Sequence, residues 1–350
     1  MTNQLTILTK LILLQMPYLN LLFLSLSILC YSTSYSQNKV VFIEGEAQGT
    51  TYHITYYDKQ DRNFEDEISK LIFEFDLSLS TYNPNSLISK INNNEKDIVL
   101  DDYFLTCFKK GKELWKNTNG AFDPTVYPLV NAWGFGPKEK IVVTKEKIDS
   151  ILAFVGFQLI NIKEGKIVKT DPRVSLDFNA FAQGYSVDIV RQFFNAKNID
   201  SYIIEIGGEV YAKGLNDKDS WLVGIEIPIA NQKSLNSYHT IVKLENKAIA
   251  TSGNYRRYII ENGEKIVHHI DPKTGYPTKN NLLSVTIISD SCIISDATAT
   301  GILVMGLKKA RKYLKKNKEI EALIIYMDRK GIYKTFLSDG FQKFIISTEN

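Results

Sequence analysis

Short segments of β-type residues, separated by turn signals, dominate the second half of this chain. The dipeptide Asn262-Gly263 between two of them is a strong hairpin signal, because both residues tolerate the positive φ angles of a tight turn. Strands joined by such turns pair in antiparallel fashion. The candidate strands are Gly49–Tyr57, Tyr202–Ile206, Trp221–Ile227, Thr240–Leu244, Tyr255–Ile260, Lys265–Ile270 and Leu283–Ser289. A further hairpin is expected over Phe157–Lys169, and two or three strands are expected at the end of the chain.

Helical periodicity is interspersed among these strands. Apolar residues recur at helical spacing from Phe64 to Leu79, with Asn63 as the expected N-cap. Further helices are expected over residues 102–117, after Thr144, over 180–195, over 292–305 and in a short basic segment beyond them. The pattern predicts an α+β fold with a mainly antiparallel sheet and flanking helices. No linker interrupts the sequence, so residues 39–350 are expected to form a single domain.

Residues 1–36 have the pattern of a secretory signal peptide, with Lys10 ahead of an apolar region and small, polar residues at its end. Polar residues interrupt the apolar region, which argues against a permanent membrane span. Cleavage after Ser36 would release a soluble protein, whereas lipidation of Cys30 would anchor it to a membrane. Leu29 stands where a lipidation signal needs a small residue. We therefore expect export to the periplasm, with both processing outcomes open.

The charge pattern argues against a nucleic-acid partner, and the cysteines argue against a disulfide-rich protein or a zinc site. The net charge is only +3, and no basic stripe with interleaved aromatic residues indicates a nucleic-acid partner. The basic run Lys308–Lys318 is typical of the solvated face of a helix. After the signal segment only Cys107 and Cys292 remain, which are too few for a disulfide framework and do not form a zinc-binding pair.

Two segments carry side chains suited to chemistry. Asp296 and Thr300 are four residues apart, so on a helix their oxygen atoms point the same way, as ligands for Mg²⁺ would. The same spacing is also common in surface pairs and helix caps. His268 and Asp271 precede a turn at Pro272, and a histidine there suits proton transfer near neutral pH. His269 follows directly, and neighbouring strand residues face opposite sides, so both rings reach one site only if the strand has ended.

Other segments suggest binding rather than reaction. Gly207-Gly208 and Thr251–Gly253 can bring backbone N–H groups to a phosphate, although ordinary hairpin turns explain them nearly as well. Gly120–Pro124 combines a helix stop with an aromatic residue and an acid, and Tyr82 lies in a similar polar loop. Each of these loops suits an aromatic ligand, but each is equally typical of residues that only end a helix and form a turn.

Taken together and in order, these segments resemble the ApbE family, the FAD:protein FMN transferases. The likeness runs from about Gly49 to Gly306. Its most specific part is the H-x-I-D-P-x-T-G pattern that begins at His268, followed by D-A-T-A-T from Asp296. The segments 177–188 and 250–253 strengthen it. The resemblance implies an ApbE-like fold related to the T-fold, with FAD as substrate and Mg²⁺ as cofactor.

The family's functional residues carry over by position. The resemblance implies that Asp296, Thr300 and the backbone carbonyl of Ala180 bind Mg²⁺, and that His268 or Asp271 removes a proton. It implies contacts to FAD from Thr50, Tyr82, Ala121, Phe122, Asp123, Asp177, Gln183 and Ile270, with Thr50 the loosest match. Gln183 replaces a lysine and loses a positive charge, and Asn179 replaces a glycine.

The expected reaction is Mg²⁺-dependent transfer of FMN from FAD to a Thr or Ser hydroxyl of an exported or membrane redox protein, with release of AMP. An FAD pyrophosphatase would use water in place of that hydroxyl. A non-catalytic flavin-binding protein is made plausible by the changes at Gln183 and Asn179, and an envelope structural protein would bind no flavin. The product and the dependence on magnesium separate these alternatives.

Overall fold

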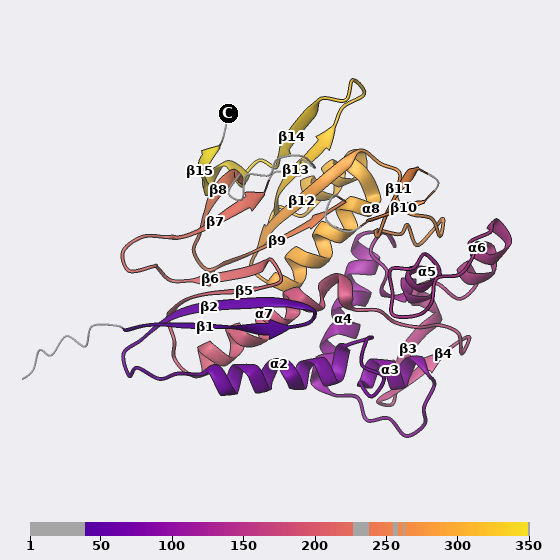
Figure 1. Ribbon diagram of the computed structural model, residues 1–350, viewed down its shortest axis with the longest axis horizontal. Coiled ribbons are helices and arrows are strands. Elements are labelled where there is room, and N and C mark those ends of the chain that lie inside the picture. Colours follow the sequence, from indigo (N-terminus) through magenta and orange to yellow (C-terminus); the bar gives the residue numbers. More distant parts are fainter. Residues whose placement is uncertain (1–38, 227–237, 255–257, 262, 349–350) are drawn as a thin grey trace, which may run out of the picture. The chain divides into compact units, whose positions relative to one another are not determined.

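A computed structural model describes residues 39–226, 238–254, 258–261 and 263–348 of the chain. The chain divides into two compact units: residues 1–39 with 58–61, and residues 40–57 with 62–350. The proposed signal segment and Cys30 lie outside the described residues, and everything below concerns the second unit. Helices and strands keep the labels of Figure 1.

The main sheet has eight strands in the order β1-β2-β5-β6-β9-β12-β13-β14, and its pairs from β2 to β14 are antiparallel. A three-stranded sheet, β15-β8-β7, and the hairpins β3-β4 and β10-β11 complete the strands of the described part. The bounds are β1 Lys39–Ala47, β2 Thr50–Asp58, β3 Ile160–Lys163, β4 Lys166–Lys169, β5 Ser201–Ile206, β6 Glu209–Lys213, β7 Trp221–Glu226, β8 Tyr238–Leu244, β9 Lys247–Gly253, β10 Tyr258–Glu261, β11 Glu264–Val267, β12 Leu282–Ser289, β13 Glu321–Met327, β14 Tyr333–Leu337 and β15 Ile345–Thr348.

The helices lie between the strands in sequence, as expected. None of those in the described part is both long and apolar enough to cross a lipid bilayer. Their bounds are α2 Glu65–Leu79, α3 Leu87–Asn92, α4 Asp102–Asn117, α5 Tyr127–Ala132, α6 Lys145–Leu152, α7 Asn179–Ala196 and α8 Cys292–Lys316, with 3₁₀ turns at Pro124–Val126, Phe157–Leu159 and Phe341–Phe344. The α+β prediction is confirmed.

The two faces of the main sheet are covered by different partners, because successive side chains of a strand point to opposite sides. Val285 and Ile287 of β12 pack with α8, whereas Ile288 packs with the three-stranded sheet. In β13, Ile324 packs with α8, and Leu323 packs with the three-stranded sheet. The central strands are therefore buried on both faces, with α7 and α8 alongside the sheet on the helical side (Figure 1).

Helix α7 meets α8 in antiparallel fashion at three matched positions. The hydroxyl of Thr300 lies 3.5 Å from the carbonyl oxygen of Ala180, and the N–H of Gly184 donates to Oδ2 of Asp296 at 3.1 Å. One turn further along α7, Asp188 reaches the first residues of α8. Positions 180, 184 and 188 share one face of α7, because residues four apart on a helix lie one above the other. This four-residue ladder places the carbonyl of Ala180 beside the side chains of α8.

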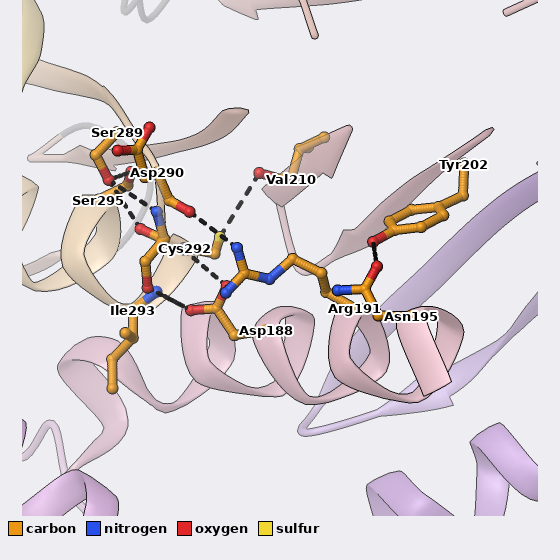
Figure 2. Close-up of polar contacts among 11 residues, drawn as sticks. Asp188, Arg191, Asn195, Tyr202, Val210, Ser289, Asp290, Cys292, Ile293 and Ser295 are labelled. Carbon is orange, nitrogen blue, oxygen red and sulfur yellow. Dashed lines mark hydrogen bonds and ion pairs between the residues drawn. The ribbon is translucent and has the colours of Figure 1, made fainter. Parts of the chain in front are cut away.

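Asp188 caps α8 from outside that helix (Figure 2). Its carboxylate accepts hydrogen bonds from the N–H groups of Cys292 and Ile293 at 3.1 and 3.0 Å and from the Ser291 hydroxyl at 2.7 Å. Arg191, one turn away on α7, lies 3.3 Å from the same carboxylate and donates to the carbonyl of Asp290. Negative charge is favoured at a helix N-terminus, so this contact fixes where α8 begins.

Several sequence-based boundaries are wrong. The predicted strand over 265–270 ends at Val267, because the chain then turns and Ile270 forms an isolated bridge with Pro277. By contrast, the predicted boundary at residue 305 is confirmed: α8 is interrupted at Gly306, whose φ of +74° is not helical, and its second part, up to Lys316, is the predicted short basic helix. The start of the predicted strand 255–260 and residue 227 lie outside the described residues. Strands β1, β6 and β9 and the short helices α3 and α5 were not predicted.

Candidate functional site

A pocket of about 330 Å³ opens where the first turn of α7 and residues 296–304 of α8 meet β9, the loop after α4 and the turn after β11. Tyr82, Asn179 and Gln183 line it and also line a second hollow of about 640 Å³, so the two cavities adjoin. Together they offer space for an elongated ligand. Eleven of the thirteen predicted site residues and the segment Thr251–Gly253 line the first pocket, and only Thr50 and Asp271 do not. The eleven are Tyr82, Ala121, Phe122, Asp123, Asp177, Ala180, Gln183, His268, Ile270, Asp296 and Thr300.

The three predicted metal ligands lie together at one end of this pocket. The α7–α8 ladder brings Asp296, Thr300 and the carbonyl of Ala180 together. The Asp296 side chain is buried, and burial raises its pKa to about 7. A buried carboxylate is costly unless a cation balances its charge. These donors are all hard oxygen atoms, and their small number suits Mg²⁺, which completes its shell with water and phosphate oxygens.

The three protein ligands are too few to enclose a metal ion by themselves. Nowhere in the described part of the chain do three or more His, Cys, Asp or Glu side chains gather as a metal-binding group. One carboxylate, one hydroxyl and one carbonyl leave most of an octahedral shell open. A cation held here would therefore depend on oxygen atoms from a bound substrate.

Both neighbouring histidines line the pocket, because β11 ends before them. Their ring centroids are 3.9 Å apart. His269 is 6% exposed, and its Nδ1 lies 2.9 Å from Oδ1 of Asn254. The amide of Asn254 donates to the carbonyl of Leu282 at 3.0 Å, which fixes its oxygen toward the ring. Nδ1 of His269 is therefore the protonated nitrogen, and its Nε2 carries a lone pair.

Replacement of His269 by Asn should weaken the loss of stability in acid. Burial, and then the neighbouring His268, hold the pKa of His269 well below its usual value. The unfolded chain therefore binds a proton below about pH 6.5 that the folded chain does not, and stability falls as pH drops through that value. The variant keeps an amide donor for Asn254 but cannot titrate. Urea unfolding at pH 7.5 and 5 should show about 2 kcal/mol less acid destabilisation than in the wild type. Equal pH dependence in both proteins would contradict this assignment.

Two of the predicted contact residues also hold the pocket wall together. Asp123 accepts hydrogen bonds from the N–H and hydroxyl of Thr125, at 2.8 and 2.6 Å, and from the N–H of Phe157 at 3.2 Å. Its carboxylate thus ties the loop after α4 to the turn before β3, besides lining the pocket. The ring of Phe122 packs edge-on against Phe181 in the core. The wall at this point is rigid.

The remaining predicted residues occupy distinct positions around the opening. Tyr82 is 55% exposed at the rim, where its ring is accessible to a ligand. Asp177 accepts from the N–H of Asn179 at 2.8 Å and so shapes the start of α7. Asn179 itself is helical, so replacing a glycine there causes no backbone strain. Gln183 lies half-buried on the same helix, with its amide close to Gly207.

Two predicted residues do not line the pocket. Thr50 lies behind Gly207, where its methyl group would be 2.9 Å from a Cβ placed on that glycine. The carboxylate of Asp271 accepts from the N–H of Lys273 at 2.9 Å, and its backbone N–H and carbonyl close the turn with Tyr276 and Gly275. Asp271 therefore shapes the turn that carries the histidines and does not face the pocket.

Other lining residues were not singled out as ligand contacts. An apolar wall is formed by residues of the unpredicted helix α5, of the segments beside it and of α8, and one acidic residue, Glu209, begins β6. The apolar residues are Val126, Val130, Phe135 and Val304. Their sequence signal, an apolar run behind Pro124, was present but is equally typical of a buried core.

Comparisons with known proteins agree with this geometry. The profile of the ApbE family matches residues 48–324. The chain belongs to the ApbE family. The FAD:protein FMN transferase of Vibrio cholerae is 35% identical over 314 residues, which cover 87% of this chain and 92% of that protein. The enzyme of the same name from Haemophilus influenzae is 34% identical, with 88% and 92% covered.

Solved ApbE structures have the same fold. The flavin transferase ApbE from Vibrio cholerae aligns with a TM-score of 0.79 at 34% identity, covering 88% of this chain and 100% of that one. The apo form of the Pseudomonas stutzeri flavinyl transferase ApbE aligns with a TM-score of 0.78 at 30% identity, covering 88% and 97%. The ApbE-like architecture implied by the sequence is confirmed.

Proposed function

We propose that this chain transfers the FMN half of FAD to a Thr or Ser hydroxyl of an acceptor protein and releases AMP. As a member of the ApbE family it is a flavin transferase, and its relatives are named FAD:protein FMN transferases. The observation that carries the proposal is the convergence of Asp296, Thr300 and the Ala180 carbonyl at the end of a pocket large enough for part of a dinucleotide.

Different residues of the pocket would bind the phosphates and the aromatic part of FAD. Asp296, Thr300 and Ala180 would hold Mg²⁺, which when bound neutralises charge on the phosphates of FAD. The apolar wall and the exposed ring of Tyr82 suit the aromatic part of the ligand. Gln183 on α7 lies between the two cavities and offers an amide to a phosphate or ribose oxygen.

His268 is the proton acceptor in this proposal. It lines the pocket, and its ring lies against that of His269. As the acceptor hydroxyl forms its bond to the FMN phosphorus, its proton passes to the imidazole, and the bond between the two phosphates breaks to leave AMP. Asp271 supports the turn instead of taking the proton itself. No nucleophile of the enzyme is needed.

The product of the reaction tests the proposal. Purified mature protein is incubated with FAD, Mg²⁺ and exported redox proteins carrying candidate acceptor residues. We expect a mass increment of one FMN on an acceptor Thr or Ser and an equal amount of AMP, both abolished by EDTA. Free FMN plus AMP with no acceptor labelled would instead identify a pyrophosphatase. FAD binding with no AMP at all would identify a flavin-binding protein.

Export is part of the same proposal, because the acceptor is expected outside the cytoplasm. The pattern of residues 1–36 supports it. Mass spectrometry of the protein from its native cells separates the two processing routes: a start after Ser36, or a lipid-modified Cys30. An intact N-terminus in the cytoplasm would refute export without affecting the chemistry.

Gln183→Lys should tighten the binding of FAD. The position lines the pocket, and the family commonly has a lysine there, so a charged donor replaces a neutral one near the pyrophosphate. We expect about a tenfold lower KM for FAD at low ionic strength, because a hydrogen bond to a charged group is worth about 1.5–3 kcal/mol. Steady-state kinetics at two salt concentrations checks this. Gln183→Met, which has similar length and no donor, should raise the KM.

A further inference from the structure

The hydroxyl of Thr300 lies between two other oxygen atoms. Its Oγ1 is 3.2 Å from Oγ of Ser252 and 3.5 Å from the carbonyl oxygen of Ala180. Ser252 belongs to β9, is half-buried and lines the same pocket. The predicted metal ligand on α8 is thus in contact with both α7 and the sheet.

The single proton of Thr300 decides which of these contacts persists when a cation binds. A hydroxyl has one donor and two lone pairs. To ligate a cation, Thr300 must direct a lone pair toward it and its proton elsewhere. A proton directed at Ala180 would point at an oxygen atom that is itself expected to face the cation, which repels it. Ser252 offers the shorter contact, on an oxygen atom that no prediction assigns to the metal.

We propose that Ser252 is a positioning residue, which accepts the proton of Thr300 and so turns a lone pair of that hydroxyl toward the cation. The proposal rests on the metal site assumed in the proposed function. Ser252 would then have its own proton available to donate to an anionic oxygen of the bound substrate. Hydrogen bonds in such a chain strengthen one another.

The position of Ser252 in the sheet makes it suitable for this task. Strand β9 pairs with β12 over residues 248–253, where Ser252 lies opposite Val285, and with β6 over residues 247–249. The hydroxyl of the preceding residue, Thr251, is engaged 2.8 Å from that of Thr286 on β12. The backbone that carries Ser252 is therefore held firmly. A change of its side chain removes or keeps one oxygen atom without moving the strand.

Binding of Mn²⁺ alone, followed by electron paramagnetic resonance of the free ion, tests this role without turnover. Mn²⁺ takes the same oxygen ligands as Mg²⁺. Ser252→Ala should raise the Kd about tenfold, the effect of one lost hydrogen bond. Ser252→Thr, which keeps the hydroxyl, should stay within about twofold of the wild type. Ser284→Ala is the matched control: a buried serine on neighbouring β12, outside the pocket lining, whose loss should leave the Kd unchanged.

Kinetics gives a second readout. Ser252→Ala should raise the Mg²⁺ concentration for half-maximal FMN transfer about tenfold, and saturating Mg²⁺ should restore most of kcat. A wild-type Kd in Ser252→Ala overturns the proposal, and so does equal weakening in Ser252→Ala and Ser252→Thr, which would indicate packing. If Asp296→Asn binds Mn²⁺ as the wild type does, the metal assignment itself fails, and the role of Ser252 fails with it.

Discussion

Asp296→Asn should abolish Mg²⁺-dependent FMN transfer and leave the fold intact. The amide has the shape of the carboxylate and can still accept the hydrogen bond from Gly184, so the α7–α8 contact survives. It carries no charge and is a poor ligand for Mg²⁺. Metal-ion catalysis contributes several kcal/mol, so we expect kcat/KM to fall about a thousandfold. Mass spectrometry of a flavinylated acceptor measures the rate.

The stability of the same variant provides its control. Asp296 is a buried carboxylate, so the metal-free protein should lose nothing when the charge is removed, and its Tm should equal or exceed that of the wild type. Added Mg²⁺ should raise the Tm of the wild type and not that of the variant. A variant that transfers FMN at the wild-type rate would remove Asp296 from the reaction, whatever its stability.

Gly184→Ala should break the contact between α7 and α8. A Cβ at this position would lie 2.5 Å from the carbonyl oxygen of Cys292 and 2.8 Å from Cβ of Asp296. The first of these atoms belongs to the backbone of α8, so the helix itself must move. Overpacking of this kind costs about 1–3 kcal/mol or more, against a gain of up to about 1 kcal/mol from helix propensity. We expect a lower free energy of unfolding in urea, and at least a hundredfold loss of transfer because Asp296 and Thr300 shift away from Ala180.

Gly301→Ala on α8 is the matched comparison. A Cβ there meets the methyl group of Thr118 at 3.2 Å, and no backbone atom of another element is among its nearest neighbours. A side chain can yield by a few tenths of an ångström, so the effect on stability should stay within about 1 kcal/mol. Equal destabilisation by the two substitutions would show that close approach at Gly184 has no special role.

The elements with strong periodicity were predictable, whereas strand β9 in the centre of the sheet was not. Helices α2, α4, α6 and α7 carry an apolar face toward the core, and their spacing predicted them. Strand β9 reads K-A-I-A-T-S-G and consists of small and mixed residues, because it lies between two layers in the centre of the sheet. Such a strand shows neither alternation nor a bulky apolar run, so propensity does not reveal it.

The site was predictable only in part, for a similar reason. The spacing of Asp296 and Thr300 placed both on one face of a helix, but nothing local indicates that Ala180 lies opposite, and only the family resemblance supplied it. Spacing also could not show that β11 stops at Val267. The carboxylates of Asp123 and Asp271 accept hydrogen bonds from the backbone N–H groups two residues ahead. Aspartate commonly makes this contact in turns, so an aspartate in a loop does not by itself indicate a role in binding or catalysis.

The three contacts that α7 makes with α8, at positions 180, 184 and 188, fix the number of residues between those positions. One residue inserted between positions 184 and 188 would rotate everything beyond it by about 100°, carrying Asp188 away from the start of α8. The β3-β4 turn is different: a side chain on Gly165 would meet no atom within 4 Å, so extra residues or a tag can be inserted there. Alignments with relatives should therefore open gaps at that hairpin and none from Ala180 to Asp188.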